Sequence, residues 1–395
     1  MPETKPDLSF DEEGICDACR SAELKNRIDW DARHGELIEI LERYRSKDGT
    51  NYDCVIPVSG GKDSTFQVMK ILELGYNPLC VTWSACSYTD IGRHNIENMQ
   101  RLGVDHIQFT PNPDVYRAMF AEAFRRVGDG CWPCHVGIWT YPIRVAVNYG
   151  VPLLIYGEQP QLEYGGPASS PYEPVMNRRW MEEFGGLLGN RIEDMLGVNG
   201  ITERDLIPYR YPTDDELLAA GVSAIFLGYY MKWDARKQLQ TVMQTDFRIN
   251  TDVADVGDTP HQEGTFTNYE NLDGKFVGVH DYLKFLKFGF GRATDHASID
   301  IRNERIGREE AIGLVRKYEG KVPRRYLTEF LEFVGMSEDE FYETLDLFTN
   351  KTIFVTDENG KIVRDENGDV LKKVWPEDTE PAEEKESLVG APPAQ

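Results

Sequence analysis

The sequence has 395 residues, of which 41% are hydrophobic and 28% are charged, so the chain has enough apolar residues for a sizeable core and more than one domain. Its formal net charge of −24 disfavours a nucleic-acid partner, because a polyphosphate backbone repels an acidic surface that lacks a local basic patch. No apolar stretch is as long as a membrane span and the first residues lack a signal-peptide core, so we expect a cytoplasmic protein without a membrane partner.

Short apolar segments alternate with helical patterns over the first two thirds of the chain. A Cys-x-x-Cys turn comes first, followed by a predicted helix over residues 30–46. Strands are predicted at 53–58, 78–83, 106–109, 152–156 and 224–230. Helices are predicted at 64–74, 91–102, 113–127, 135–148 and 233–244. Such alternation is typical of an α/β fold with a parallel sheet covered by helices on both faces.

The pattern divides the chain into four regions. Residues 1–50 form an N-terminal Cys-x-x-Cys segment with its helix, and residues 51–250 form the α/β domain. That domain has an insertion, at about 158–222, which is rich in glycine, proline and tyrosine. Residues 251–350 are mainly helical and are expected to contact substrate or partner, and residues 351–395 are expected to form a hairpin and an acidic, disordered tail.

The first predicted strand ends abruptly in a glycine turn, within the run VIPVSGGKDS at residues 55–64. Glycines allow a tight turn whose backbone N–H groups form an anion-binding nest, and the helix that follows adds its N-terminal partial positive charge. Lys62 supplies a full positive charge, Ser59 and Ser64 supply hydroxyl donors, and Asp63 is placed to reach a phosphate-bound Mg²⁺. The turn is therefore predicted to bind a phosphate, although it lacks the spacing of a Walker A loop.

The pattern Ser-Gly-Gly-x-Asp-Ser resembles the PP-loop of the ATP pyrophosphatase superfamily, which has an adenine nucleotide alpha hydrolase-like, Rossmann-like fold. The resemblance implies that ATP is split into AMP and pyrophosphate at this turn, with Lys62 and Asp63 as catalytic residues. It implies an ATP-binding and pyrophosphate-binding set of Ser59, Gly60, Gly61, Lys62, Asp63, Ser64, Thr82, Trp83 and Gly157. For Trp83, simple packing is an equally good interpretation.

Two Cys-x-x-Cys pairs are candidates for a metal site. Cys16 and Cys19 lie in GICDACR, and Cys131 and Cys134 lie in GCWPCH. Each pair places two thiolates on one tight turn, so the two pairs together predict a structural Zn²⁺ site with four cysteine ligands and an N-terminal zinc knuckle. An iron–sulfur cluster, a persulfide-forming cysteine and a redox-active pair remain open as alternatives.

Five motifs together narrow the resemblance to one family. GICDACR, IPVSGGKDS, CWPCHVGIW, LGYYMKWDA and KFGFGRATDHASIDIR are similar to segments of the N-acetyl sugar amidotransferases, from about residue 14 to 345 apart from much of the insertion and the tail. These bacterial enzymes act in the biosynthesis of surface polysaccharides such as the LPS O-antigen, and of pseudaminic and legionaminic acid.

The family resemblance implies a reaction and partners. ATP with Mg²⁺ would adenylate the acetamido oxygen of a nucleotide-linked sugar, and ammonia would displace AMP to leave an acetamidine. The ammonia would come from a separate glutaminase subunit accompanied by a cyclase-like companion, both of the histidine-biosynthesis type. Neither the sugar nor its nucleotide carrier is indicated by the sequence.

The segment GRATDHASIDIR supplies most of the candidate substrate residues. Asp295 and His296 are candidates for orienting the acetamido group or moving a proton, and are predicted catalytic residues. Arginine side chains suit a diphosphate or carboxylate. The predicted substrate-binding set is Arg292, Asp300, Arg302, Lys232 and Asp234, with routine ion pairs as an equal alternative for each.

Two other functions fit part of the sequence. One is a PP-loop enzyme that thiolates tRNA, which would require a basic RNA-binding surface and a sulfur-carrying Cys131 or Cys86. The other is a regulator that binds ATP without turning it over, which the presence of Lys62 and Asp63 disfavours.

Overall fold

A computed structural model describes residues 1–84, 87–165, 175–176, 187–250 and 264–374. Its centre is a six-stranded sheet in the order β3-β2-β1-β4-β6-β5. The strands are β1 (Cys54–Pro57), β2 (Pro78–Trp83), β3 (Asp105–Phe109), β4 (Leu153–Tyr156), β5 (Val175–Met176) and β6 (Ser223–Phe226). The first four and β6 are parallel, and only the short edge strand β5 is antiparallel to its neighbour. The predicted α/β fold with a parallel sheet is confirmed.

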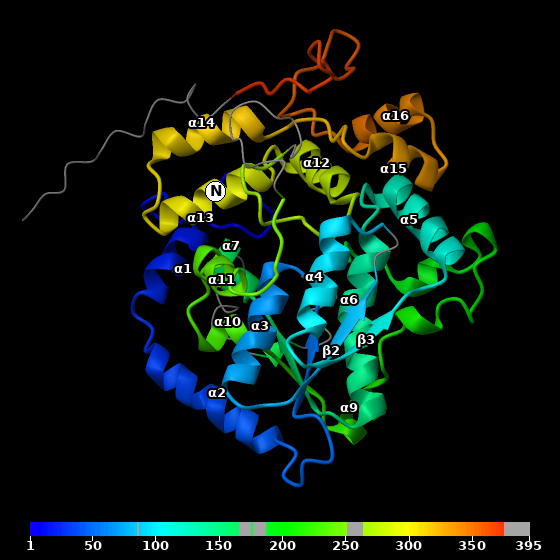
Figure 1. The fold of residues 1–395 in the computed structure, drawn as a ribbon. Helices are drawn as coiled ribbons and strands as arrows, with labels where there is room; N and C mark the ends of the chain where they lie inside the picture. The colour runs from blue at the N-terminus through cyan, green and yellow to red at the C-terminus, as the bar shows by residue number, and fades with distance from the viewer. Residues whose placement is uncertain (85–86, 166–174, 177–186, 251–263, 375–395) are drawn as a thin grey trace, which may run out of the picture.

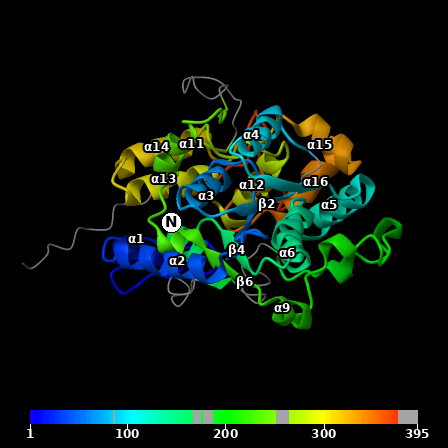
Figure 2. The same cartoon turned by 60° about the horizontal axis from the view of Figure 1, so that its bottom comes forward.

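Alternate residues of the buried strands point to opposite faces of the sheet. Cys54, Ile56 and Ile155 belong to the core under α2 (Trp30–Tyr44), α3 (Lys62–Glu73), α4 (Asp90–Gln100) and α11 (Ala235–Val242). Val55 and Leu154 belong to the core under α5 (Pro113–Val127) and α6 (Trp132–Tyr149). In Figure 2, α3 and α6 lie on opposite sides of the strands. Burial on both faces explains why the strands are continuous apolar runs.

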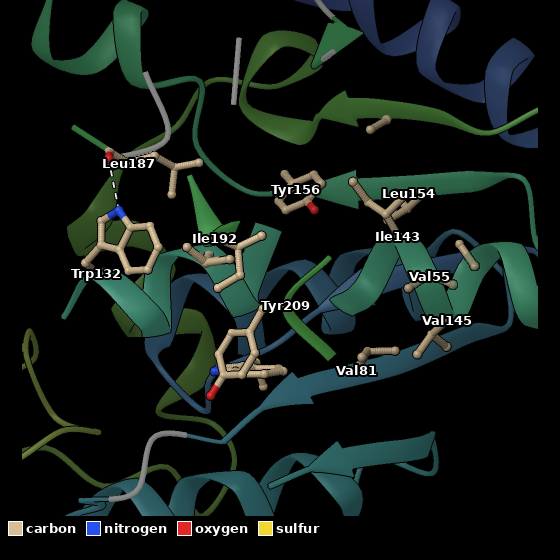
Figure 3. Packing of buried hydrophobic residues seen from close by; sticks show 14 of the residues in the cluster. Val55, Val81, Trp132, Ile143, Val145, Leu154, Tyr156, Leu187, Ile192 and Tyr209 are labelled. Atoms are coloured by element: carbon tan, nitrogen blue, oxygen red, sulfur yellow. Dashed lines mark hydrogen bonds between the residues drawn. The ribbon is translucent and has the colours of Figure 1, made fainter. Parts of the chain in front are cut away.

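The core on the α6 side extends into the insertion. Figure 3 shows Val55 and Leu154 of the strands near Ile143 and Val145 of α6, while Ile192 and Tyr209 of the insertion lie toward Trp132 in the same cluster. The indole N–H of Trp132 donates to the carbonyl oxygen of Leu187, at 2.9 Å. The described part of the insertion is therefore attached to the sheet by a continuous apolar core.

Five C-terminal helices gather at one end of the molecule, at the top of Figure 1. They are α12 (Val277–Phe288), α13 (Arg292–Arg302), α14 (Arg308–Tyr318), α15 (Leu327–Val334) and α16 (Glu338–Phe348). Phe120 and Phe124 of α5 pack against Phe330 of α15 with ring centroids 5.9 and 5.1 Å apart. Helix α5 therefore contributes to both the sheet core and the core of the C-terminal helices.

Shorter elements complete the described chain. They are α1 (Asp17–Lys25), α7 (Pro160–Tyr164), α9 (Asp214–Ala220), α10 (Leu227–Tyr230), and the single turns η2 (Ile192–Met195), η3 (Val198–Gly200) and η4 (Ile207–Tyr209). Near the end of the described chain, isolated antiparallel pairs join Phe354 to Lys372 and Arg364 to Val370. No helix among the described residues has the length and apolarity needed to cross a membrane. The predicted acidic tail from residue 375 lies outside the described residues.

Two predicted local structures are wrong. The strand predicted over residues 224–230 ends at Phe226, because the N–H of Gly228 donates to Gly157 and the N–H of Met231 donates to Leu227, which closes the helical turn α10. The turn expected at the first cysteine pair is the start of a helix, in which Cys16 caps α1. Its N–H hydrogen bonds run back from Cys19 and Arg20 to the Cys16 carbonyl.

Candidate functional site

The glycine turn connects β1 to the N-terminus of α3. Gly60 has φ +82°, and a Cβ atom there would lie 2.8 Å from Ile96 Cγ1, so only glycine fits. The Ser64 hydroxyl accepts from the N–H of Ser59 and donates to the carbonyl of Gly61, while the N–H of Gly61 donates to the Ser59 hydroxyl. The two predicted phosphate-binding serines therefore brace the turn itself in this conformation.

Lys62 is buried in the first turn of α3 and contacts two carboxylates. Its Nζ lies 2.7 Å from Asp63 Oδ2 and 2.7 Å from Glu270 Oε1, with 4% of the side chain exposed. Burial by itself would lower the pKa of Lys62, but Asp63 and Glu270 outweigh it and the pKa is raised. Burial also raises the pKa of Asp63, an effect that Glu270 reinforces and Lys62 opposes. A charged ammonium is therefore held at the end of β1, beside the helix N-terminus.

Glu158 lies near this group at the end of β4. Burial, and then the charge of Asp63, raise the pKa of Glu158 to about 8. The Tyr164 hydroxyl donates to Glu158 at 3.5 Å. The neighbouring Gly157 is held close to α3, because a Cβ atom there would meet the Gln67 amide nitrogen at 2.3 Å. The loop after β4 thus adds a carboxyl group that binds a proton near neutral pH.

Two of the predicted ATP-binding residues, Thr82 and Trp83, are buried at the end of β2. Thr82 donates to the carbonyl of Val58 at 2.7 Å and lies 2.8 Å from a ring nitrogen of His106. Trp83 is 3% exposed and its ring packs against Phe109 and Tyr209, with centroids 5.2 and 4.8 Å apart. In this conformation Trp83 is a core residue, as the packing interpretation expects.

A cavity of about 420 Å³ lies beside the charged group. Its lining has four cationic side chains and two carboxylates together with histidines and apolar residues; the charged ones are Lys5, Lys284, Lys287, Arg292, Asp129 and Asp295. Arg292 connects it to the glycine turn, because the guanidinium charge acts on Asp63 and Glu270. Tyr164 also lines the cavity and bonds to Glu158. Such a volume is in the range of small-molecule sites.

Three predicted residues of α13 lie at or beside this cavity. Arg292 faces Asp281, whose carboxylate raises its pKa and lies 3.7 Å from its Nε. Asp295 forms an ion pair with Lys284. His296 is buried behind them, with Nδ1 3.0 Å from the Thr265 hydroxyl.

The protonation state of His296 follows from its surroundings. Burial, reinforced by Arg292, lowers the pKa of His296 to about 3, so the imidazole is neutral near pH 7. A neutral imidazole held by a threonine can orient a group through a hydrogen bond. It cannot serve as a cationic contact for phosphate.

The remaining predicted substrate residues lie in two other groups. Asp300 pairs with Arg236 and Arg305, and Arg305 also pairs with Asp234, so both carboxylates are neutralised within an ion-pair network that joins α11 to α13. Lys232 and Arg302 line a small separate cavity together with Lys25 and Glu163. Neither group lines the 420 Å³ cavity.

The four predicted zinc ligands are not assembled into one site in this conformation. The Cys16 and Cys19 sulfurs lie 3.5 Å apart, but neither belongs to a metal-binding group in the part of the chain that the structure describes. There, the group close enough to hold a metal is Asp129, Cys131 and His280. Cys86, the other cysteine considered for sulfur transfer, lies outside the described residues.

Sequence reasoning missed Glu270, Asp129 and His280. Glu270 lies in NYENLDGK, 208 positions after Lys62, and no local spacing connects the two. Asp129 lies two residues before Cys131, so its position beside a Cys-x-x-Cys pair was a signal in the sequence that it could share a metal site with Cys131. His280 stands alone on α12 and carries no such signal.

Comparisons with known proteins relate the C-terminal part of the chain to a family of known description. Residues 263–366 match the family model described as LPS biosynthesis protein WbpG-like, C-terminal domain. The chain is also 29% identical over 161 residues to the uncharacterized protein MJ1599 of Methanocaldococcus jannaschii, which is 40% of this chain and 55% of that protein. The chain thus aligns with about half the length of this curated relative.

A solved structure similar to this chain is the NMN synthetase from Francisella tularensis, with a TM-score of 0.31 and 11% identity. The alignment covers 70% of this chain and 94% of that one. A similarity this low carries no argument about function. The stretch matched by the family model contains Glu270, Arg292 and His296, which are the C-terminal contributors to the site. The chain therefore carries the C-terminal domain of the WbpG-like LPS biosynthesis proteins, which supports the N-acetyl sugar amidotransferase-type family that its sequence predicts.

Proposed function

We propose that the protein is an ATP-dependent amidotransferase that converts the N-acetyl group of a nucleotide-linked sugar into an acetamidino group. The observation that carries this proposal is the buried Lys62 at the end of β1, held by Asp63 and Glu270 beside a cationic cavity of about 420 Å³. The WbpG-like C-terminal domain supports a role in LPS or related glycan biosynthesis.

The glycine turn suits the triphosphate of ATP. Gly60 lets the turn pack tightly against α4, and the N-terminus of the twelve-residue helix α3 lies at the turn. Lys62 would exchange its contact with Glu270 for the β- and γ-phosphates and stabilise the charge on the departing pyrophosphate. Lys62 thus acts on the leaving group.

Three carboxyl groups near the turn have the chemistry of a Mg²⁺ site. Asp63, Glu158 and Glu270 provide hard oxygen ligands, and Mg²⁺ is usually held by one or two carboxylates together with substrate phosphates. When bound, the ion would neutralise phosphate charge and help to orient the triphosphate. Two of these groups, Asp63 and Glu270, also contact Lys62 in this structure.

The cavity suits an anionic sugar derivative. Lys284, Lys287 and Arg292 provide cationic contacts for a diphosphate, and Phe288 and Phe290 provide apolar surface. Arg292 and Tyr164 mark the side nearest the glycine turn, so the acetamido group is expected there. The ion pairs of Asp234 and Asp300 give those residues a positioning role between α11 and α13.

The proposed chemistry consists of two displacements. The acetamido oxygen attacks the α-phosphorus of ATP, an oxygen–phosphorus bond forms, and pyrophosphate leaves. Ammonia then attacks the imidate carbon, AMP leaves with the former acetamido oxygen, and loss of a proton gives the amidine. Because an amide oxygen is a poor leaving group, the contribution of the chain is mainly to align the oxygen with the α-phosphorus.

We also propose that the ammonia comes from a separate glutaminase subunit with a cyclase-like companion, docked near the carboxyl end of the sheet. The site lies at that end, because the glycine turn follows β1 and Gly157 follows β4. Ammonia delivered there would reach the imidate directly.

Mass spectrometry of nucleotide-sugars tests the proposal. Acetamido nucleotide-sugars are incubated with the protein, ATP, Mg²⁺ and ammonium, and a product lighter by about one mass unit is expected, because NH replaces O. AMP and pyrophosphate should form in equal amounts with it, and omission of the sugar should abolish them. If ATP remained intact with every sugar tested, the proposed activity would be excluded and an ATP-binding regulator favoured.

A further inference from the structure

The lining of the 420 Å³ cavity includes part of a cluster that the proposed function does not use. Asp129, Cys131 and His280 offer a carboxylate oxygen, a sulfur and an imidazole nitrogen that all lie within 4.8 Å of one another. His280 Nδ1 lies 2.9 Å from Asp129 Oδ1, and the ring of His135 lies 5.3 Å from that of His280. The two histidines and Asp129 line the cavity.

The cluster is held by rigid elements that meet at this point. Gly128 ends α5 with φ +62°, and Gly130 packs so closely that a Cβ atom there would lie 2.4 Å from Phe120. The N–H of Cys131 donates to Asp129 Oδ1 at 2.9 Å, which fixes the carboxylate next to the thiol. Position 131 caps α6, while His280 comes from α12.

Lys287 of α12 connects the two sides of this cluster. Its Nζ donates to the carbonyl oxygens of Val127 at 2.7 Å and Gly128 at 3.0 Å. These two hydrogen bonds join the ligand-bearing loop to the ligand-bearing helix, which favours a preorganised metal site.

A sulfur, an imidazole and a carboxylate form a ligand set for Zn²⁺, which binds these donors at about 2.0–2.3 Å. A tetrahedral ion would place neighbouring ligand atoms roughly 3.3–3.7 Å apart, so side-chain shifts of about an ångström assemble the site from the observed separations. Three protein ligands leave one position for another group, the arrangement of zinc sites that bind a substrate or water.

We propose that Asp129, Cys131 and His280 bind a divalent metal ion of the zinc class whose remaining coordination position faces the 420 Å³ cavity. The open position would take water or an oxygen of the molecule in the cavity. This proposal assigns Cys131 to a site different from a four-cysteine cluster, and it requires neither Cys16 nor Cys19. It concerns metal binding and stands whether or not the amidotransferase activity is found.

Metal loading of the full-length protein tests the site. The protein is stripped of metal with a chelator, incubated with Zn²⁺ or Co²⁺, freed of excess ion and measured by elemental analysis. About one ion per chain is expected in the wild type and in the Cys16→Ser variant. Asp129→Asn and His280→Gln are each expected to weaken binding by at least about tenfold, since each removes a ligand. His94→Gln is the matched control, because His94 contacts Asp246 on the surface, away from the cavity.

The Co²⁺ absorption spectrum provides a second readout that needs no variant. A single thiolate ligand gives a weak sulfur-to-metal charge-transfer band, whereas four thiolates give a band several times stronger. Weak charge transfer, together with loss of metal in His280→Gln but not in Cys16→Ser, supports the proposal. Strong charge transfer with loss of metal in Cys16→Ser would overturn it in favour of the four-cysteine site, and a wild type that binds no ion would also overturn it.

Discussion

Lys62 donates to two carboxylates, Asp63 next to it in α3 and Glu270 from the distant segment before α12. An ammonium with 4% of its surface exposed needs such partners, because the cost of burying a charge alone is several kcal/mol. The same contacts hold the group where the phosphates of ATP are proposed to bind. In the proposed reaction the nucleotide would replace Glu270 on Lys62, which would couple the C-terminal region to the glycine turn.

Replacing Lys62 tests its role in the reaction. Lys62→Met keeps the side-chain length but removes the charge, so pyrophosphate release is expected to fall by about 10²–10³-fold, as when one transition-state donor is removed. The folded protein is also expected to lose about 3–5 kcal/mol of unfolding free energy, since Asp63 and Glu270 lose their partner. Both quantities are measured, by a pyrophosphate assay and by urea unfolding.

Lys70→Met on the same helix is the matched control. Lys70 pairs with Glu73 at 2.6 Å near the surface, so both activity and stability are expected to stay close to wild type. Equal pyrophosphate release by the Lys62→Met and Lys70→Met variants would contradict the assignment of Lys62 to the leaving group.

Glu158 is expected to make the unfolding free energy depend on pH, and the direction of this dependence follows from its raised pKa. Burial raises its pKa from 4.5 to about 8, so the folded protein keeps a proton on Glu158 that the unfolded chain has released. Between about pH 4.5 and pH 8 the folded state binds more protons, and its stability falls as pH rises.

The variant Glu158→Gln removes this proton. The unfolding free energy of the wild type minus that of Glu158→Gln is expected to fall steadily from pH 5 to pH 8. At the alkaline end the variant is expected to be the more stable protein. Urea unfolding at four pH values measures it. Glu73→Gln, at an exposed position of α3, should show no such trend, and parallel curves for wild type and Glu158→Gln would refute the raised pKa.

The turn between β1 and α3 depends on two separate properties of Gly60. Its φ of +82° disfavours any side chain, and a Cβ atom would also approach Ile96 Cγ1 to 2.8 Å and Ile96 N to 3.0 Å. Gly75, at the other end of α3, has φ +81° but nothing within 4 Å of such an atom. A comparison of alanine variants at the two positions therefore distinguishes backbone strain, present at both, from steric conflict, present only at Gly60.

The variant Gly75→Ala is expected to cost about 1–2 kcal/mol of unfolding free energy, which is the strain of a left-handed alanine. Gly60→Ala should cost at least about 1 kcal/mol more, because α4 must move away, and should weaken ATP binding as well. Chemical unfolding and ATP titration measure the two effects. Equal stability losses at both positions, with unchanged ATP binding, would show that the close approach to α4 is unimportant.

Periodicity predicted most elements around the turn but not how they pack. Strands β1, β2 and β4 were predicted because burial on both faces makes them largely apolar runs. The run 224–230 is just as apolar, yet only its first part is a strand, because the contact between Gly228 and the Gly157 carbonyl redirects the backbone. That contact involves residues 71 positions apart, so no local pattern contains it.

The candidate site shows the same division between local and distant information. The SGGKDS turn is local and was recognised, and its position between β1 and α3 is as predicted. Glu270 is a partner chosen by tertiary contact, and the ion pairs of Asp300 with Arg236 and Arg305 are of the same kind. The sequence around Asp300 does not indicate that this carboxylate is neutralised by arginines outside α13.

At the scale of the whole molecule, α5 joins parts that the sequence pattern separates. Its Met119 and Ala123 belong to the sheet core, while Phe120 and Phe124 belong to the core of the C-terminal helices. One helix that contributes to two cores makes them mutually dependent, because neither can unfold without exposing apolar surface of α5. The α/β region and the C-terminal helices are therefore expected to unfold together.

The variant Phe330→Ala tests this dependence, because Phe330 of α15 is 1% exposed and packs on both phenylalanines of α5. A loss of about 3–5 kcal/mol of unfolding free energy is expected, because truncating the buried side chain leaves a new cavity.

The positions of the tryptophans allow the two regions to be followed separately. Apart from Trp375, all tryptophans precede residue 234, so tryptophan fluorescence reports mainly on the α/β region. If the molecule unfolds as one unit, Phe330→Ala shifts the fluorescence transition in urea as far as the circular dichroism transition. Leu347→Ala is the control and should shift neither transition, because this side chain on α16 is 78% exposed. A fluorescence transition that stayed at the wild-type urea concentration would mean that the C-terminal helices unfold independently, and Glu270 would then leave Lys62 whenever they open.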